Sequence, residues 1–192
     1  MARIAMVYHS GYGHTAKVAE AVAKGSMEIS GTQVDILPID AEGNLSEQAW
    51  VILSIADGII FGSPTYMSGP SWQFKKFADA SSKPWSALLW KDKLFAGFTN
   101  SASMNGDKLS TLDYMFHLSQ QHGGIWAGMG MLPSNTKAAT RQDVNYIAGV
   151  SGLMTVSPAD ASVEEAPLPG ELETARLFGQ RIAQLAQRWS RV

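Results

Sequence analysis

The sequence predicts one α/β domain over residues 1–192, with a doubly wound parallel sheet covered by helices on both faces. Apolar, strand-like runs alternate with helical patterns along the chain, and no internal repeat interrupts them. The strand-like runs are apolar almost without a break, which is typical of parallel strands that are buried on both sides. At 192 residues, the chain can also bury a substantial core.

Each expected element follows from a local pattern. Gly31 ends the first helix, Ser46 can cap the second, and Pro70 suits the first position of the third. Pro167 and Pro169 introduce the last helix, whose apolar residues keep helical spacing. In chain order we expect strands at residues 3–8, 34–39, 59–61 and 93–99, with a fifth beginning at 124–127, and helices at residues 14–30, 46–55, 70–80 and 107–121, with a last one that includes 172–189.

Composition excludes several classes of function. The net charge of −2 provides neither the basic surface that nucleic acids require nor a polybasic patch for membranes. The chain has no cysteine, which excludes disulfides, zinc thiolates and iron–sulfur clusters, and no other spacing indicates a metal site. No leader and no 18-residue apolar run occur, so we expect a cytoplasmic protein. Only 17% of the residues are charged, which suggests much buried surface, including a subunit interface.

The segment from Ile4 to Ala16 carries the most specific local signal. An apolar strand runs into a glycine-rich turn, and a helical pattern begins directly after it. Such a turn presents backbone N–H groups at the positive end of a helix dipole, an arrangement that binds phosphate. Gly11-Tyr12-Gly13-His14-Thr15-Ala16 fits the dinucleotide pattern G-x-G-x-x-A, which alone is a weak signal. A second reading makes Ser10 and Thr15 hydroxyl donors to a terminal phosphomonoester, and a third makes the segment an ordinary strand–helix turn.

Two further strand ends distinguish these readings. The third strand ends in Gly62-Ser63-Pro64-Thr65-Tyr66-Met67, and the fourth ends in Thr99-Asn100-Ser101-Ala102-Ser103. Ligands of doubly wound sheets bind beyond the carboxyl ends of the strands. A pyrophosphate needs only the first turn, whereas a planar heteroaromatic ring needs polar backbone groups and an apolar wall from the other two loops. Three small, polar and uncharged loops therefore favour the phosphomonoester of an aromatic cofactor.

The order of these motifs resembles the flavodoxin-like FMN proteins, most closely the WrbA-like NAD(P)H:quinone oxidoreductases of the NADPH-dependent FMN reductase superfamily. The shared features are Y-x-S-x-Y-G-H-T after the first strand, G-S-P-T-Y after the third, Trp85, His122-Gly123, and E-L-x-x-A-R-x-x-G-x-x-I-A in the last helix. They extend over nearly the whole chain. The resemblance implies a flavodoxin-like, five-stranded parallel sheet in the order 2-1-3-4-5.

The resemblance also implies which residues hold FMN. The phosphate is expected at the turn after the first strand, and the isoalloxazine ring at the other two loops and Trp85. Three departures bear on the electron acceptor and on the preference for NADH or NADPH. The arginine–phenylalanine pair usual after Pro-Thr is Tyr66-Met67 here, the loop after the fourth strand is less glycine-rich, and residues 130–150 differ from the relatives. The expected FMN-binding residues are Ser10, Tyr12, Gly13, His14, Thr15, Pro64, Thr65, Tyr66, Met67, Trp85, Thr99, Asn100, Ser101, Ala102 and Ser103.

His122 is the candidate catalytic residue. At the end of a helix, a histidine can simply be favoured by the helix dipole. The resemblance instead implies a place near the flavin ring, where the imidazole can bind a quinone oxygen and donate a proton. Both readings stay open on the sequence.

We therefore expect an FMN-dependent oxidoreductase that transfers two electrons from NADH or NADPH to a quinone-like acceptor by a ping-pong mechanism. Because the three loops contain no Asp or Glu before Asp107, their neutral dipoles do not disfavour the reduced, anionic flavin. The resemblance and the low charge suggest a homodimer or homotetramer. The alternatives are a flavodoxin-type electron carrier or flavin-binding regulatory protein without turnover, and a Rossmann-type dehydrogenase. The aperiodic segment Gly128–Pro158 is a candidate for covering the ring and setting the acceptor.

Overall fold

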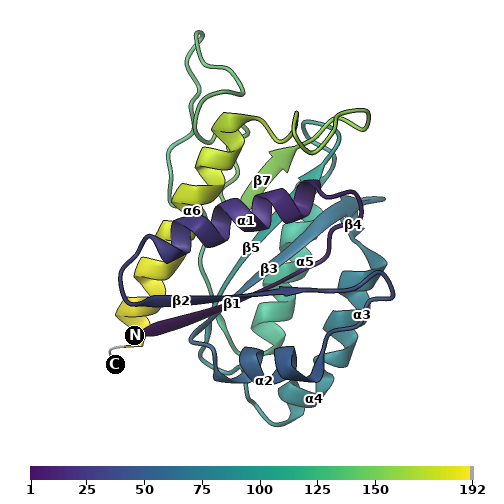
Figure 1. Ribbon diagram of the computed structural model, residues 1–192, viewed down its shortest axis with the longest axis vertical. Helices are drawn as coiled ribbons and strands as arrows, with labels where there is room; N and C mark the ends of the chain where they lie inside the picture. The colour runs from purple at the N-terminus through teal and green to yellow at the C-terminus, as the bar shows by residue number, and fades with distance from the viewer. Residues whose placement is uncertain (191–192) are drawn as a thin grey trace.

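The computed structural model describes residues 1–190 and shows a parallel sheet between two layers of helices (Figure 1). Its main strand order is β2-β1-β3-β5-β6, with β4 paired to β3 and β7 paired to β5. The strands are β1 Ala2–Tyr8, β2 Thr32–Pro38, β3 Gly58–Tyr66, β4 Gly69–Pro70, β5 Leu94–Ser101, β6 Ile125–Trp126 and β7 Leu153–Val156. The helices are α1 His14–Met27, α2 Glu47–Ile55, α3 Trp72–Ala80, α4 Ser82–Ser86, α5 Lys108–Gln121 and α6 Pro169–Trp189.

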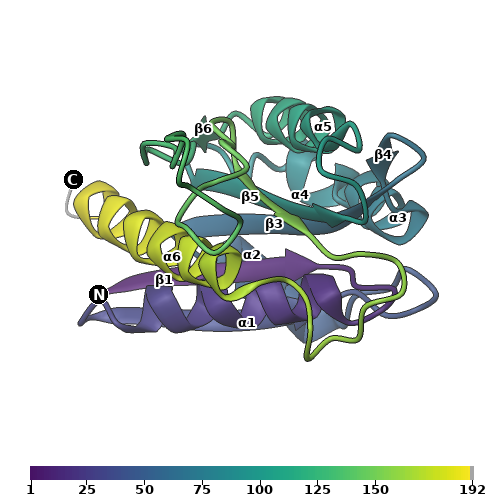
Figure 2. The same cartoon turned by 90° about the horizontal axis from the view of Figure 1, so that it is seen from above.

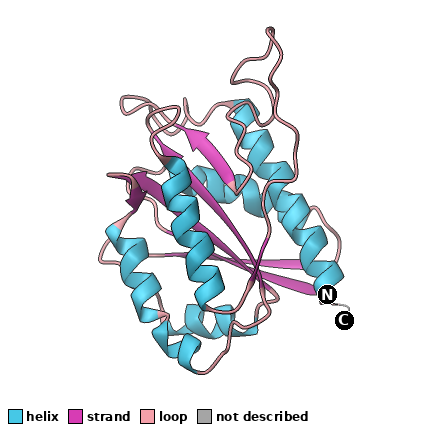
Figure 3. Cartoon of the chain, turned by 180° about the vertical axis from the view of Figure 1, so that it is seen from behind, coloured by secondary structure: helices cyan, strands magenta, loops and turns pink. Residues whose placement is uncertain are grey.

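The expected strand order is confirmed, but its fifth position is shared by two short strands. β6 pairs with the start of β5, where Leu94 lies opposite Ile125. β7 pairs with the end of β5, where Ser101 lies opposite Val156. Residues 127–152 between them contain no helix or strand. The segment starts packed on the core through Ala127 and Met129, and a loop of it projects beyond the end of the sheet beside α6 (Figure 3). We refer to residues 127–152 as the insert.

Alternate residues of the strands face the two helix layers, as the period of a strand requires. In β1, Ile4 and Met6 pack on the side of α1 and α6, whereas Ala5 and Val7 pack on the side of α2, α3 and α5. Figure 2 shows α1 and α6 together on one side of the sheet, with α3, α4 and α5 on the other. Burial on both sides explains why the strands are apolar almost without a break.

α1 and α6 approach closely because two glycines leave room at their contact. A Cβ atom at Gly25 would lie 1.8 Å from the carbonyl oxygen of Arg176, and one at Gly179 would lie 2.0 Å from that of Val22. The Ser26 hydroxyl donates to the Gly179 carbonyl oxygen at 3.0 Å across the same contact. The last helix is thereby held against α1, whose N-terminus forms the expected phosphate turn.

The starts of α2 and α6 agree with the signals in the sequence, and the start of α3 does not. Ser46 caps α2 as expected, and Pro169 is the first residue of α6. Pro70 does not begin a helix: it pairs with Thr65 in the β3–β4 hairpin, and Ser71 caps α3 instead. The tight hairpin turn decides this, because the chain first runs back along β3 before the helix starts.

Two negative findings apply to residues 1–190. No helix there has the length and apolar character needed to cross a bilayer. No group of three or more His, Asp or Glu side chains in that range is placed to hold a metal ion.

Candidate functional site

A cavity of about 580 Å³ opens at the carboxyl ends of β1, β3 and β5. Its volume lies within the range of small-molecule and cofactor sites. Four segments line it: the β1–α1 turn, the end of β3, the β5–α5 loop and the loop between β7 and α6. The lining residues are Tyr12, His14, Thr15, Pro64, Thr65, Tyr66, Asn100, Ser101, Ala102, Ser157, Pro158, Ala159, Ala161, Ser162 and Val163.

The β1–α1 turn offers hydrogen-bond donors to an anion. Ser10 Oγ accepts from the N–H groups of Gly13 at 3.2 Å and Ala16 at 3.1 Å, which leaves its own hydroxyl hydrogen free to donate. The N–H groups of His14 and Thr15 lie in the first turn of α1, where a helix provides no internal acceptor. The Thr15 hydroxyl makes no hydrogen bond within residues 1–190, although Thr15 is 2% exposed and lines the cavity. These donors lie at the positive end of the helix dipole.

The β7–α6 loop lies directly against this turn. The His14 Nε2 atom is 3.1 Å from the Ala161 carbonyl oxygen, and the Lys17 ammonium donates to the Val163 carbonyl oxygen. Because the His14 imidazole is engaged with Ala161, its backbone N–H is the group left for an anion. A Cβ atom at Gly13, where φ is 91°, would lie 2.6 Å from Val163 Cγ1. Glycine at this position therefore permits both the turn and the close approach of the loop.

Two tyrosines and a buried threonine form another part of the wall. Tyr12 and Tyr66 make an edge-to-face contact with ring centroids 6.3 Å apart, and they are 80% and 38% exposed. Aromatic rings at the mouth of a cavity can cover a flat ligand. The Thr65 hydroxyl lies 2.8 Å from the hydroxyls of both Thr99 and Thr111, a contact that holds β3 to β5 and α5.

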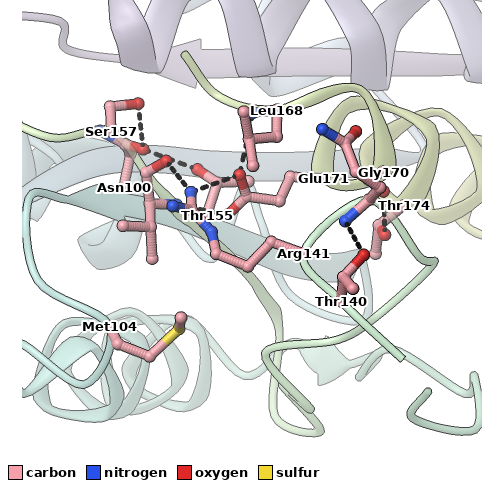
Figure 4. Close-up of polar contacts among 12 residues, drawn as sticks. Asn100, Met104, Thr140, Arg141, Thr155, Ser157, Leu168, Gly170, Glu171 and Thr174 are labelled. Carbon is pink, nitrogen blue, oxygen red and sulfur yellow. Dashed lines mark hydrogen bonds and ion pairs between the residues drawn. The ribbon is translucent and has the colours of Figure 1, made fainter. Parts of the chain in front are cut away.

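Asn100 presents its amide donor to the cavity. Its Oδ1 accepts from Thr155 Oγ1 at 2.9 Å and from Ser157 Oγ at 3.0 Å (Figure 4). Two hydroxyl donors on one oxygen set the orientation of the amide and leave the Nδ2 hydrogens for a ligand acceptor. Asn100 as a residue is only 6% exposed, and an acceptor on a ligand in the cavity would complete the hydrogen bonding of its amide.

The lining of the cavity is uncharged. None of the residues that line it, all within 1–190, is Asp, Glu, Lys or Arg. Burial raises the pKa of Tyr66 above its usual value, and the neighbouring Tyr12 acts in the same direction, so the phenol stays neutral. With donors at the end of α1 and no carboxylate in the lining, the cavity suits an anionic ligand.

Most of the expected binding residues come together in this cavity. Ser10, Gly13, Thr99 and Ser103 belong to the same loops and support the cavity without lining it. Met67 lies at the tip of the β3–β4 hairpin, where its side chain is 100% exposed. The expected residues that line the cavity are Tyr12, His14, Thr15, Pro64, Thr65, Tyr66, Asn100, Ser101 and Ala102.

His122 does not lie in the cavity, contrary to what the resemblance implied. It follows α5 at the amino end of β5, because Ile125 just after it pairs with Leu94. Its imidazole is 2% exposed, lies 2.9 Å from Ser81 Oγ through Nε2 and packs on Trp90 with ring centroids 4.3 Å apart. The cavity is at the other end of β5, so the single chain offers His122 no route to a ligand there.

Trp85 is also outside the cavity, on α4. α3 starts at the carboxyl edge of the sheet and carries the chain back toward the amino edge, where α4 lies close to α2 in Figure 1. Trp85 therefore lies between two site loops in sequence but not in space. Trp85 is 43% exposed, which is more than a core residue or a residue in the wall of a cofactor site would show.

The β7–α6 loop is the part of the site that was not expected from the sequence. It contributes six of the lining residues, from Ser157 to Val163. The signal was present, because S-P-A-D-A-S follows an apolar strand in the same way as the other small, polar loops. Of the expected segment Gly128–Pro158, only Ser157 and Pro158 line the cavity, so the insert does not cover it within one chain.

Comparison with known proteins identifies the family. The family model for NADPH-dependent FMN reductases matches residues 51–142. The crystal structure of a flavodoxin, WrbA-like protein from Agrobacterium tumefaciens is 51% identical, with a TM-score of 0.77 over 98% of this chain and 99% of that chain. The chain belongs to the WrbA-like family of flavodoxin-like FMN proteins.

Two curated relatives of this WrbA-like protein carry different names. Flavodoxin FldP of Pseudomonas aeruginosa is 48% identical over 97% of this chain and 98% of its own length. An NAD(P)H dehydrogenase (quinone) of Geotalea uraniireducens is 31% identical over 98% of this chain and 100% of its own length. The family is thus one of flavodoxin-like oxidoreductases, and its named members include a flavodoxin and quinone dehydrogenases.

The donors around the cavity fit FMN, the cofactor that the family name implies. A terminal phosphate needs several donors, and the hydroxyls of Ser10 and Thr15 lie beside the free first-turn N–H groups of α1. The polar edge of a flavin ring needs a donor between apolar walls, and Asn100 Nδ2 lies in a cavity that Tyr12 and Pro64 also line. No carboxylate lines the cavity within residues 1–190 to repel the phosphate.

Proposed function

We propose that this WrbA-like protein binds FMN in the cavity and transfers two electrons from NADH or NADPH to a quinone-like acceptor in a ping-pong cycle. One observation carries this proposal: the Thr15 hydroxyl and the Asn100 amide have unused donors at an uncharged cavity beyond three strand ends. Membership of the family supports the cofactor. The relatives that are named NAD(P)H dehydrogenase (quinone) support the class of acceptor.

In this proposal FMN supplies the redox chemistry, and the chain supplies binding, orientation and electrostatics. Ser10, Gly13, His14 and Thr15 hold the phosphate through two hydroxyls and the backbone N–H groups of the helix start. Tyr12 covers the ring from the mouth of the cavity. The residues assigned to the ring are Pro64, Thr65, Tyr66, Asn100, Ser101 and Ala102, all of which line the cavity.

The uncharged lining supports two-electron chemistry. Negative charge that develops on a reduced ligand meets an amide donor and backbone dipoles rather than carboxylates, so the anion is not disfavoured. A strongly acidic rim would have the opposite effect and would favour one-electron transfer.

Titration of the purified protein with FMN, followed by its visible spectrum, tests the cofactor. We expect saturation at one FMN per chain and NADPH oxidation that depends on benzoquinone. Initial rates at several fixed benzoquinone concentrations should give parallel double-reciprocal lines. Intersecting lines would contradict the ping-pong order, and an absence of flavin binding would overturn the whole proposal.

A flavodoxin-type electron carrier is the second candidate, and the 48% identity to flavodoxin FldP favours it. The net charge of −2 argues against a carrier, because carriers steer toward their partners with a strong field of one sign. A carrier would bind FMN equally well but would accept electrons from NADPH only through a separate flavoprotein reductase. NADPH oxidation with benzoquinone, measured with and without such a reductase, distinguishes the two.

A further inference from the structure

Lys108 is a buried cation in an unusual place. It is the first residue of α5, where the helix dipole disfavours positive charge, and it is 0% exposed. Its ammonium donates to the carbonyl oxygens of Ser103, of Met104 at 3.1 Å and of Asn105 at 3.5 Å. Such partners are what makes a buried ammonium tolerable, because an unpaired charge in the interior is costly.

These carbonyl oxygens belong to the β5–α5 loop, residues 102–107, which wraps around the ammonium. Ser101 Oγ also donates to the Ser103 carbonyl oxygen at 3.3 Å, and Asp107 takes a positive φ of 50° before the helix starts. The Asp107 carboxylate accepts from the Ser68 hydroxyl of the β3–β4 hairpin at 3.2 Å. The same loop lines the cavity through Ala102, with Ser101 just before it.

We propose that Lys108 is a positioning residue for the cofactor, whose ammonium holds the β5–α5 loop in the shape that presents Ser101 and Ala102 to the cavity. This inference rests on the proposed FMN site. Lys108 itself does not line the cavity, so it acts through the loop. Without the ammonium, three carbonyl oxygens would lose their common donor. The remaining contacts of this exposed loop would then not offset the conformational entropy that is lost when the loop is ordered.

The charge on Lys108 is expected to respond to mildly alkaline pH. Burial lowers the pKa of Lys108 to about 8, so the ammonium is largely charged at neutral pH. The charged groups that face it are Glu171 of α6, which raises this pKa, and Arg141 of the insert, which lowers it. Asp107 precedes it in the chain. A neutral amine keeps only two hydrogens for three carbonyl oxygens, so FMN affinity should fall as the pH rises through this pKa.

Lys108→Met removes the ammonium with little change in length, and Lys108→Arg retains a charge. Lys93 provides a matched control at the amino end of β5, because its ammonium donates to the carbonyl oxygens of Ser54 at 2.9 Å and of Ala56. Burial lowers the pKa of Lys93 as well. We expect Lys108→Met to weaken FMN binding by about tenfold or more at neutral pH and to abolish its pH dependence. Lys93→Met should leave both unchanged.

Hydrogen–deuterium exchange of the FMN-free protein gives a readout that needs no cofactor. Exchange at residues 102–107 should be faster in Lys108→Met than in the wild type, and unchanged in Lys93→Met. Wild-type affinity and an unchanged pH profile in a folded Lys108→Met protein would overturn the inference. Failure of the wild type to bind FMN would instead overturn the proposed function. If Lys108→Met does not fold, the test is the FMN affinity of the wild type measured against pH. Equal affinity below and above the pKa of Lys108 would overturn the inference.

Discussion

Arg141 and Glu171 form an ion pair that fastens the insert to the first turn of α6. Arg141 Nη2 lies 2.8 Å from Glu171 Oε2 and donates to the Val156 carbonyl oxygen at 2.8 Å (Figure 4). Glu171 is 3% exposed and also accepts from the N–H groups of Val156 at 2.8 Å and Leu168 at 2.9 Å. One carboxylate therefore joins the insert to both ends of the β7–α6 loop, which lines the cavity.

Arg141→Met should lower the free energy of unfolding by about 3 kcal/mol, because it leaves the buried Glu171 carboxylate without its counter-ion. Urea unfolding measures this loss. Arg188→Met, at an exposed position late in α6, is the matched control and should change stability little. A loss for Arg141→Met of less than about 1 kcal/mol, the size of an exposed pair, would show that the insert is held by other contacts.

Thr15→Ala should weaken FMN binding by about 10- to 100-fold, because one hydrogen bond to a charged phosphate is lost. Thr15 lines the cavity, and its backbone N–H remains in the first turn of α1 in the variant. Isothermal titration with FMN measures the change. Thr136→Ala, in the exposed insert, should bind like the wild type. Equal affinity in both variants would place the phosphate elsewhere.

Asn100→Asp should lower the reduction potential of bound FMN. The substitution replaces the Nδ2 donor with a carboxylate oxygen in a cavity without other carboxylates, so negative charge on the reduced cofactor is disfavoured. Thr155 and Ser157 can still donate to the other oxygen, which preserves the packing. Spectroelectrochemistry at neutral pH measures the potential. A potential equal to that of the wild type would mean that Asn100 is not near the flavin ring.

His122 should contribute a pH dependence of stability rather than catalysis. Burial lowers the pKa of His122 to about 4, whereas an unfolded histidine titrates near its usual value. The unfolded chain therefore binds a proton between about pH 6.5 and pH 4 that the folded chain does not, so stability falls with falling pH by about 3 kcal/mol over this window. His122→Gln cannot titrate and should flatten the curve of unfolding free energy against pH.

The same variant separates the two readings of His122. Because the imidazole lies at the amino end of β5, His122→Gln should leave FMN affinity and the rate of quinone reduction within about twofold of the wild type. A loss of quinone reduction by two orders of magnitude in a folded protein would restore the catalytic reading. An unchanged slope of stability against pH would contradict the structural reading.

Local sequence was sufficient to predict the sheet and much of the candidate cavity. The apolar run before Ser10, the G-S-P-T-Y segment and the small residues after Thr99 each place a polar loop at a strand end. Parallel strands that are joined by helices bring these ends to one edge, so spacing alone predicted that the loops meet. Pro70 was misplaced because a two-residue turn diverts the chain before α3, and that turn at Met67 and Ser68 lacks the usual Asn-Gly signal.

By itself, the sequence determined the alternation of strands and helices, the donors at Ser10 and Thr15, and the uncharged character of three loops, because these depend on neighbours in the chain. Only the tertiary structure decided what each loop meets. Close packing of α6 on α1 brings Val163 against Gly13 and so completes the cavity with a loop about 150 residues away from the turn it touches. The same long-range packing buries Lys108 beneath its loop and keeps His122 at the far end of β5, because burial depends on contacts that no local spacing encodes.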